Sequence, residues 1–134
     1  MPRMIFVNLP VSDVARARAF HQALGHTINE KFSDATAACV VVSETIHIMV
    51  LSRGRFGEFA SLPVADPKTI TGCLVALSQD SRDAVDAFAT AALAAGGSEP
   101  KPVSDLGFMY QRTVADPDGN LFEPFWMDPA AAGG

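Results

Sequence analysis

The sequence predicts an α+β fold built from two βαβββ units. In each half of the chain, an apolar strand-like segment precedes a capped, helix-forming segment, and three strand-like segments follow the helix. The two halves therefore repeat one order of elements over most of the 134 residues. Two such units can pair their sheets into one curved, mostly antiparallel, cup-shaped sheet with the helices on its outer face.

The first unit is predicted to span residues 4–52. Ser12 or Asp13 can cap its helix, and Gly25 ends that helix because glycine readily takes a left-handed conformation. The strands are indicated by apolar runs or by alternation of polar and apolar residues. In order, the predicted elements are a strand at 4–9, a helix at 14–24 and strands at 27–33, 35–42 and 45–51.

Residues 53–69 interrupt this pattern with glycines and prolines, so they are predicted to form a linker, with a short helix near 56–61. The second unit is predicted at 70–128. Asp80 or Ser81 can cap its helix, which the pair of glycines at 96–97 ends. Its predicted elements are a strand at 70–78, a helix from the cap to residue 93 and strands at 98–103, 108–115 and 121–127.

The sequence DPDGN at 116–120 predicts a tight turn between the last two strands, because proline, aspartate and glycine suit its successive dihedral angles. Side chains alternate along a strand, so Glu123 shares a face with Leu121 and Phe125. Phe122, Pro124 and Trp126 point to the opposite face. A carboxylate in this setting is either a metal ligand or general base in a cavity, or a strand-edge residue that reaches water or pairs with Arg112 on the neighbouring strand.

Composition limits the classes of function. The length fits one domain over residues 1–134, and no apolar run reaches the roughly 20 residues that a membrane helix needs. A net charge of −5 offers no basic patch, so nucleic acid is not an expected partner, and the chain is expected in the cytoplasm. Cys39 and Cys73 lie in apolar runs and are predicted to be buried thiols. His21 and His26, at the end of the first helix, are predicted at the surface.

Two motifs, FVNLPVSD before the first helix and GFMYQRTVADPDGNLFEPFW near the end, carry a resemblance to a known family. With the paired βαβββ units, they make the whole chain resemble the vicinal oxygen chelate superfamily, which includes glyoxalases, bleomycin-resistance proteins and extradiol dioxygenases, and in particular its glyoxalase-like branch. The resemblance implies a small-molecule ligand in a cup, a homodimer and, in the metal-dependent members, a divalent ion such as zinc, nickel, manganese or iron.

The ligand positions of the metal-dependent members lie on the first and last strands of each unit. Glu123 stands where the resemblance places a glutamate ligand, and carboxylates are sound ligands for these ions. Phe6 stands at the matching position of the first strand and cannot ligate, and the position in the second unit falls on Cys73 or Leu74. His47 is the strong donor nearest to the fourth position, so the metal site is incomplete.

Three hypotheses about function follow. The first is a cup that binds a small apolar or aromatic molecule without metal, as bleomycin-resistance-like proteins do. The second is a metal-dependent glyoxalase-like lyase or isomerase, or a dioxygenase, in which Glu123 and His47 hold the ion. The third is a metal-free enzyme with Glu123 as the general base. The candidate ligand-binding residues are Phe6, Phe108 and Phe125 as apolar walls and Asn8, His47, Tyr110 and Arg112 as polar groups.

Overall fold

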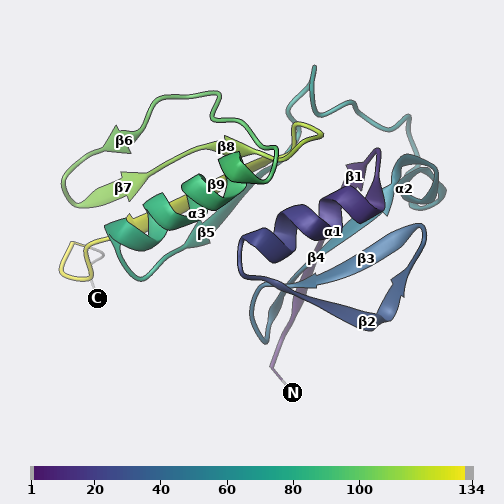
Figure 1. Ribbon diagram of the computed structural model, residues 1–134, viewed down its shortest axis with the longest axis horizontal. Coiled ribbons are helices and arrows are strands. Elements are labelled where there is room, and N and C mark those ends of the chain that lie inside the picture. The colour runs from purple at the N-terminus through teal and green to yellow at the C-terminus, as the bar shows by residue number, and fades with distance from the viewer. Residues whose placement is uncertain (1, 132–134) are drawn as a thin grey trace. The chain divides into compact units, whose positions relative to one another are not determined.

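The structure is a computed structural model that describes residues 2–131 (Figure 1). The chain divides after Ile70 into two compact units, and each unit contains its own sheet with a helix packed on one face. The first unit has the order βαβββ, and in the second unit a strand and a helix are followed by four strands, which confirms the predicted α+β class. One cup formed jointly by both sheets stays a prediction. No helix in the described part of the chain is long and apolar enough to cross a membrane.

The first unit holds four strands in the order β1-β4-β3-β2. β1 and β4 run parallel, whereas the other neighbours are antiparallel, so the sheet is mostly antiparallel as predicted. A short helix follows the last strand where the sequence predicts a linker. The elements are β1 (Ile5–Val11), α1 (Val14–Ala23), β2 (Thr27–Asp34), β3 (Ala37–Val41), β4 (Ile46–Ser52) and α2 (Arg53–Phe59).

α1 begins at a capped end and buries one face against the first sheet. The Asp13 side chain accepts a hydrogen bond from the Arg16 backbone N–H, which settles the choice between the two predicted capping residues. Val14, Ala17 and Phe20 recur every three residues and are buried, as an amphipathic helix on a sheet requires. The helix contacts β2, β3 and β4. The strand residues that are fully buried in this core are Ala38, Val40, Ile48 and Val50.

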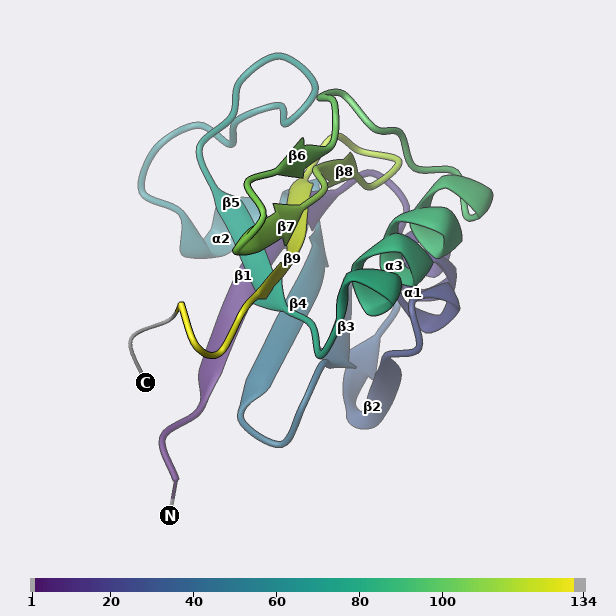
Figure 2. The same cartoon turned by 90° about the vertical axis from the view of Figure 1, so that its left-hand side faces the viewer.

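The second unit has the strand order β5-β9-β7-β6, with β8 paired to the other end of β9. Figure 2 shows β5, β9 and β7 side by side. β5 runs parallel to β9, and the other pairs are antiparallel. Ser81 caps the helix by accepting from the Ala84 N–H. The elements are β5 (Leu74–Ser78), α3 (Arg82–Ala94), β6 (Ser104–Asp105), β7 (Met109–Gln111), β8 (Val114–Ala115) and β9 (Leu121–Met127).

The second unit differs from the prediction in two strands. The strand predicted at 98–103 is absent from these described residues; Ser98 makes an isolated bridge to Ala115, and the short β6 comes later. The strand predicted at 108–115 is divided into β7 and β8, because the residue opposite Arg112 on β9 is Pro124, which has no backbone N–H to donate to the ladder. β9 and the turn before it are as predicted: the Asp116 N–H donates to the Asn120 carbonyl at 2.9 Å.

Two predictions about burial were wrong. His21 is completely buried in the first unit, and its Nδ1 lies 3.5 Å from Nδ1 of the half-buried His26. The two imidazole rings stack with centroids 5.7 Å apart, so this end of α1 turns its histidines into the core instead of toward solvent. Cys39 is buried as predicted, but Cys73 lies before the start of β5 and is exposed.

Candidate functional site

The face of the first sheet opposite α1 carries three of the predicted site residues. The parallel register of β1 and β4 sets Phe6 beside His47 and Asn8 beside Met49. Residues that are directly paired point to the same side of a sheet, so these four side chains share one face. Ile48 alternates with them and is fully buried on the other face. The sequence therefore predicted correctly that Phe6 and Asn8 share a face, and the structure adds His47 to it.

His47 and Phe6 form a stacked pair on this face. Their ring centroids are 4.5 Å apart and the ring planes differ by 16°. His47 is only 7% exposed, whereas Phe6 is 46% exposed and covers one side of the imidazole. Nδ1 of His47 is buried and has no hydrogen-bond partner among the described residues. The imidazole is thus held by aromatic stacking, with an apolar neighbour where a second metal donor would have to stand.

A pocket of about 400 Å³ opens beside this face in the first unit. It combines one amide side chain from β1 with apolar side chains from β4, from α2 and from the residue that follows α2. Its lining residues are Asn8, Leu51, Phe56, Phe59 and Ala60. The pocket is therefore largely apolar, with a single side chain able to give and accept hydrogen bonds.

The helix α2 builds the aromatic side of this pocket. Ser52 ends β4 and caps α2, because its hydroxyl accepts from the Arg55 N–H at 3.2 Å. Phe56 and Phe59 are three residues apart and thus lie on one face of the helix. Sequence reasoning missed both residues because it treated 53–69 as a linker, although the Phe-x-x-Phe spacing within FGEF was the available signal.

Asn8 is the polar group of this pocket. Its Nδ2 donates to the Phe6 carbonyl at 3.2 Å, which leaves the amide oxygen without a partner among the described residues. An asparagine side chain can make up to four hydrogen bonds, so most of this capacity remains available. Asn8 also lines a second pocket, of about 350 Å³, on the β2 side of the sheet.

Glu123 lies in the second unit and is half-buried on the face of β9 away from α3. Its Oε2 accepts a hydrogen bond from Nε2 of Gln111 at 3.0 Å. Ala76 is its direct neighbour on β5, and Phe125 shares its face. Sequence reasoning singled out Tyr110 and Arg112, but the register sets Gln111 opposite Phe125 and therefore on the face of Glu123, while Tyr110 and Arg112 lie on the other face.

Arg112 does not pair with Glu123, which corrects the ion pair considered from the sequence. Its Nε and Nη2 donate to the two carboxylate oxygens of Glu99 at 2.8 and 2.9 Å, and Nη1 donates to Asp86 at 3.0 Å. These two carboxylates raise the pKa of Arg112 further above its usual range, with the Glu99 hydrogen bonds as the main cause. The Arg112 backbone N–H still donates to the Pro124 carbonyl of β9 at 3.1 Å, while its side chain reaches α3.

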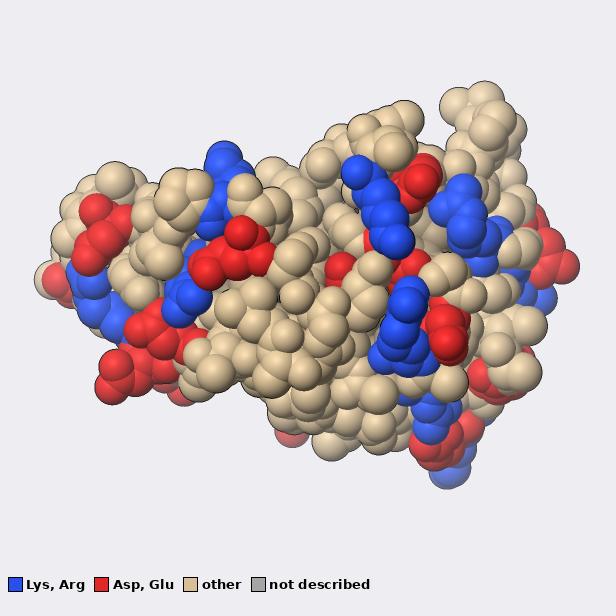
Figure 3. Space-filling model, turned by 45° about the horizontal axis from the view of Figure 1, so that its top comes forward, with Lys and Arg blue, Asp and Glu red and all other residues tan. Residues whose placement is uncertain are grey.

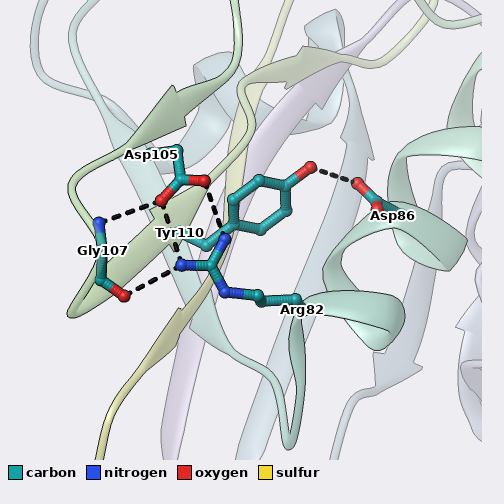
Figure 4. Close-up of polar contacts among 5 residues, drawn as sticks. All are labelled: Arg82, Asp86, Asp105, Gly107 and Tyr110. Carbon is teal, nitrogen blue, oxygen red and sulfur yellow. Dashed lines mark hydrogen bonds and ion pairs between the residues drawn. The ribbon is translucent and has the colours of Figure 1, made fainter.

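Tyr110 is engaged with the same helix. Its hydroxyl donates to Asp86 at 2.6 Å, while the guanidinium of Arg82 lies 5.0 Å from its ring centroid (Figure 4). Arg82 also binds both carboxylate oxygens of Asp105, at 2.8 and 3.0 Å, and this contact lowers the pKa of Asp105 to about 2. The contacts join α3 to the β6–β7 hairpin, so Tyr110 and Arg112 belong to a polar network on the helix side of the sheet.

The two remaining predicted site residues are apolar. Phe108 is 48% exposed and precedes β7, where its carbonyl accepts from the Asp128 N–H. Phe125 is half-buried and lies opposite Gln111 on β7. Of the eight predicted residues, Phe6, Asn8 and His47 belong to the first unit, and the other five belong to the second.

The residues present do not fit the metal site that the resemblance implies. Catalytic zinc normally has three protein ligands, and no group of three His, Cys, Asp or Glu side chains in residues 2–131 could hold an ion. Phe6 stacks on His47, while Gln111 and Ala76 flank Glu123. Neither unit therefore supplies a second donor beside its one predicted ligand.

Comparison with known proteins supports the family on two grounds. Residues 3–43 match the family described as bleomycin resistance protein-like N-terminal. No curated protein matches the chain in sequence. Solved structures match its fold over nearly the whole chain.

A glyoxalase/bleomycin resistance protein/dioxygenase family enzyme from Burkholderia phytofirmans PsJN has a TM-score of 0.76 at 20% identity, covering 94% of this chain and 99% of its own. A glyoxalase-related enzyme from Fulvimarina pelagi has a TM-score of 0.76 at 18% identity, covering 94% and 88%. Hypothetical protein SA1046 from S. aureus has a TM-score of 0.78 at 18% identity, covering 94% of each chain. At these identities the likeness concerns the fold.

The family match begins just before β1 and extends through β3, and the shared fold extends over nearly the whole chain. Residues 3–43 are thus similar to the bleomycin resistance protein-like N-terminal family, and the chain shares its fold with proteins described as glyoxalase/bleomycin resistance protein/dioxygenase family members, in agreement with the resemblance seen in the sequence.

Proposed function

We propose that the chain binds a small apolar or aromatic molecule in the pocket of the first unit, without a metal ion. The observation that carries the proposal is the pocket of about 400 Å³ that Phe56 and Phe59 of α2 form with Leu51 and Asn8. Small-molecule sites are typically concave, 300–1,000 Å³ in volume and mostly apolar, with a few polar groups that fix orientation. Asn8 supplies such a group here.

Exposure of the aromatic residues supports the same proposal. Phe59 is 70% exposed although it lines the pocket, and Phe56 is half-buried. A phenylalanine that exposes this much of its ring gains little from burial in the protein alone. A flat ligand that covers the ring would gain both the buried apolar area and aromatic contact. Covering these exposed rings would therefore contribute favourably to the free energy of binding.

Phe59→Ala is expected to weaken the binding of cinnamamide, a neutral aromatic probe, by about tenfold, since loss of one aromatic wall costs about 1–1.5 kcal/mol. The matched control is Leu62→Ala, which removes another exposed apolar side chain, 78% exposed, from outside the pocket lining. Isothermal titration calorimetry on wild type and both variants measures the dissociation constants. Equal affinity in wild type and Phe59→Ala, or no binding by any of the three proteins, would contradict the proposed site.

The catalytic hypotheses and the state of association stay predictions. The donors around His47 and Glu123 do not favour a metal-dependent lyase, isomerase or dioxygenase. A role for Glu123 as a general base would require that Glu123→Gln abolish turnover while ligand binding is retained. The homodimer and the cytoplasmic location also stay predictions from the sequence and its resemblance.

A further inference from the structure

The pocket of the first unit continues into a second one. The two share Asn8, Leu51 and Phe59, and the second extends across the sheet toward β2. The two pockets have volumes of about 400 and 350 Å³ and lie in the same unit, which leaves room for a ligand with two chemically different ends. The second pocket differs in its lining, because it includes three charged side chains, whereas the first includes none.

Two cations line this second pocket, Lys31 from β2 and Arg55 from α2. Arg55 is already engaged: its Nη1 lies 3.1 Å from Glu58, and its guanidinium lies 5.1 Å from the centroid of the Phe59 ring. The Lys31 ammonium makes no ion pair within residues 2–131. Lys31 is therefore the cation of this lining whose charge is not already balanced by a carboxylate.

The acidic residue of the lining, Asp34, is engaged locally. Its Oδ1 accepts from the N–H and the hydroxyl of Thr36, at 2.7 and 2.8 Å. These two hydrogen bonds are the main reason why the pKa of Asp34 lies below its usual range, so its charge is fixed at neutral pH. Lys31, Arg55 and Asp34 give the lining itself a net charge of +1, while Glu58, which pairs with Arg55, lies outside the lining.

The surroundings make this charge a local feature. Figure 3 shows basic and acidic side chains intermixed over the face that it presents, without a large patch of one sign. The chain as a whole carries a net charge of −5, so its long-range field repels anions. Attraction of an anion must therefore come from direct contact with Lys31. Phe32, the next residue along β2, is 68% exposed and also lines this pocket.

We infer that the ligand is an amphipathic anion, with an apolar or aromatic body and one carboxylate or similar monoanionic group. Its body lies against Phe56 and Phe59, and its anionic group contacts the Lys31 ammonium. This inference rests on the proposed function, because it assigns a chemical class to the ligand of the same site. Asn8, which lines both pockets, is placed to hydrogen-bond the part of the ligand between its two ends.

Cinnamate and cinnamamide distinguish the proposed apolar site from the inferred anionic ligand class, since the two compounds have nearly the same shape and differ in charge. Wild type is expected to bind cinnamate about three- to tenfold more tightly than cinnamamide. A partly exposed, hydrogen-bonded contact between a carboxylate and an ammonium group gives a difference of this size. Lys31→Met is expected to abolish this preference and leave cinnamamide binding unchanged. The control Lys68→Met removes an exposed lysine of the same unit that lines neither pocket, and it should keep the preference.

Calorimetry at low and moderate salt gives the dissociation constants for both probes and all three proteins. Equal binding of the two probes by wild type, or a preference that persists in Lys31→Met, would overturn the anionic ligand class. Phe59-dependent binding of cinnamamide would then still support the proposed function. Binding of neither probe would overturn the proposed function and this inference together.

Discussion

Asp116→Ala is expected to lower the free energy of unfolding by about 3 kcal/mol, because it removes the acceptor that holds the turn before β9. Asp116 is 5% exposed, and its Oδ1 accepts from the backbone N–H groups of Asp118 and Asn120 at 2.9 and 2.8 Å. Its Oδ2 accepts from Nδ2 of Asn120 at 2.9 Å. Buried donors that lose their acceptor cost about 1–3 kcal/mol each, so the loss of three such bonds exceeds most single substitutions.

The matched control is Asp116→Asn, which keeps Oδ1 but places an NH₂ group opposite Nδ2 of Asn120. We expect it to cost about 1–2 kcal/mol, since one of the three hydrogen bonds is lost and two remain. Urea denaturation followed by circular dichroism gives both values. A cost below about 1 kcal/mol for Asp116→Ala, or equal costs for the two variants, would mean that these hydrogen bonds do not stabilise the turn.

Lowering the pH from 7 to 5 is expected to remove about 2 kcal/mol of stability through His21 alone. Burial, and secondarily the charge of His26, lowers the pKa of His21 to about 3, whereas an unfolded histidine has its ordinary value of 6.5. The unfolded chain therefore binds more protons than the folded chain between these two values. Titration of His21 therefore leaves the free energy of unfolding unchanged well above pH 6.5 and lowers it progressively as the pH falls toward 3.

His21→Phe tests this prediction, because it keeps a flat ring in the core but cannot titrate. The pH interval from 7 to 5 lies above the range in which carboxylates with lowered pKa values lose their charge, so they do not obscure the result. The loss between pH 7 and 5 should fall well below 2 kcal/mol in the variant; the remainder comes from His26, whose pKa burial also lowers. The same pH dependence in wild type and His21→Phe would contradict a buried neutral His21.

Local signals in the sequence were sufficient where a few adjacent residues determine the backbone. The DPDGN turn was predicted because proline and glycine set its dihedral angles, and Gly119 indeed has a φ of +99°. The alternation along β9 was predicted from the two-residue period of a strand, and Phe122 and Pro124 are indeed buried between half-buried neighbours. The helix caps and the βαβββ order likewise depend on residues within a few positions of each other.

Tertiary contacts decided what the sequence could not. The side chain of Arg112 pairs with Asp86 and Glu99 instead of Glu123, and these partners lie far from it along the chain. His21 is buried by packing that its helix position does not reveal. The pocket was missed because its aromatic residues lie in a helix within a glycine- and proline-rich segment, and only the fold brings that helix onto β1 and β4.

The most direct test of the proposed site is a two-dimensional ¹H–¹⁵N NMR titration of labelled protein with cinnamate. We expect the largest chemical-shift changes at residues 51–60 and at Asn8, including its side-chain amide, because these groups line the pocket. Resonances of β9 around Glu123, in the second unit, should move little. Changes confined to the region around Glu123 and Gln111, with none in residues 51–60, would contradict the account and place the ligand on the second sheet.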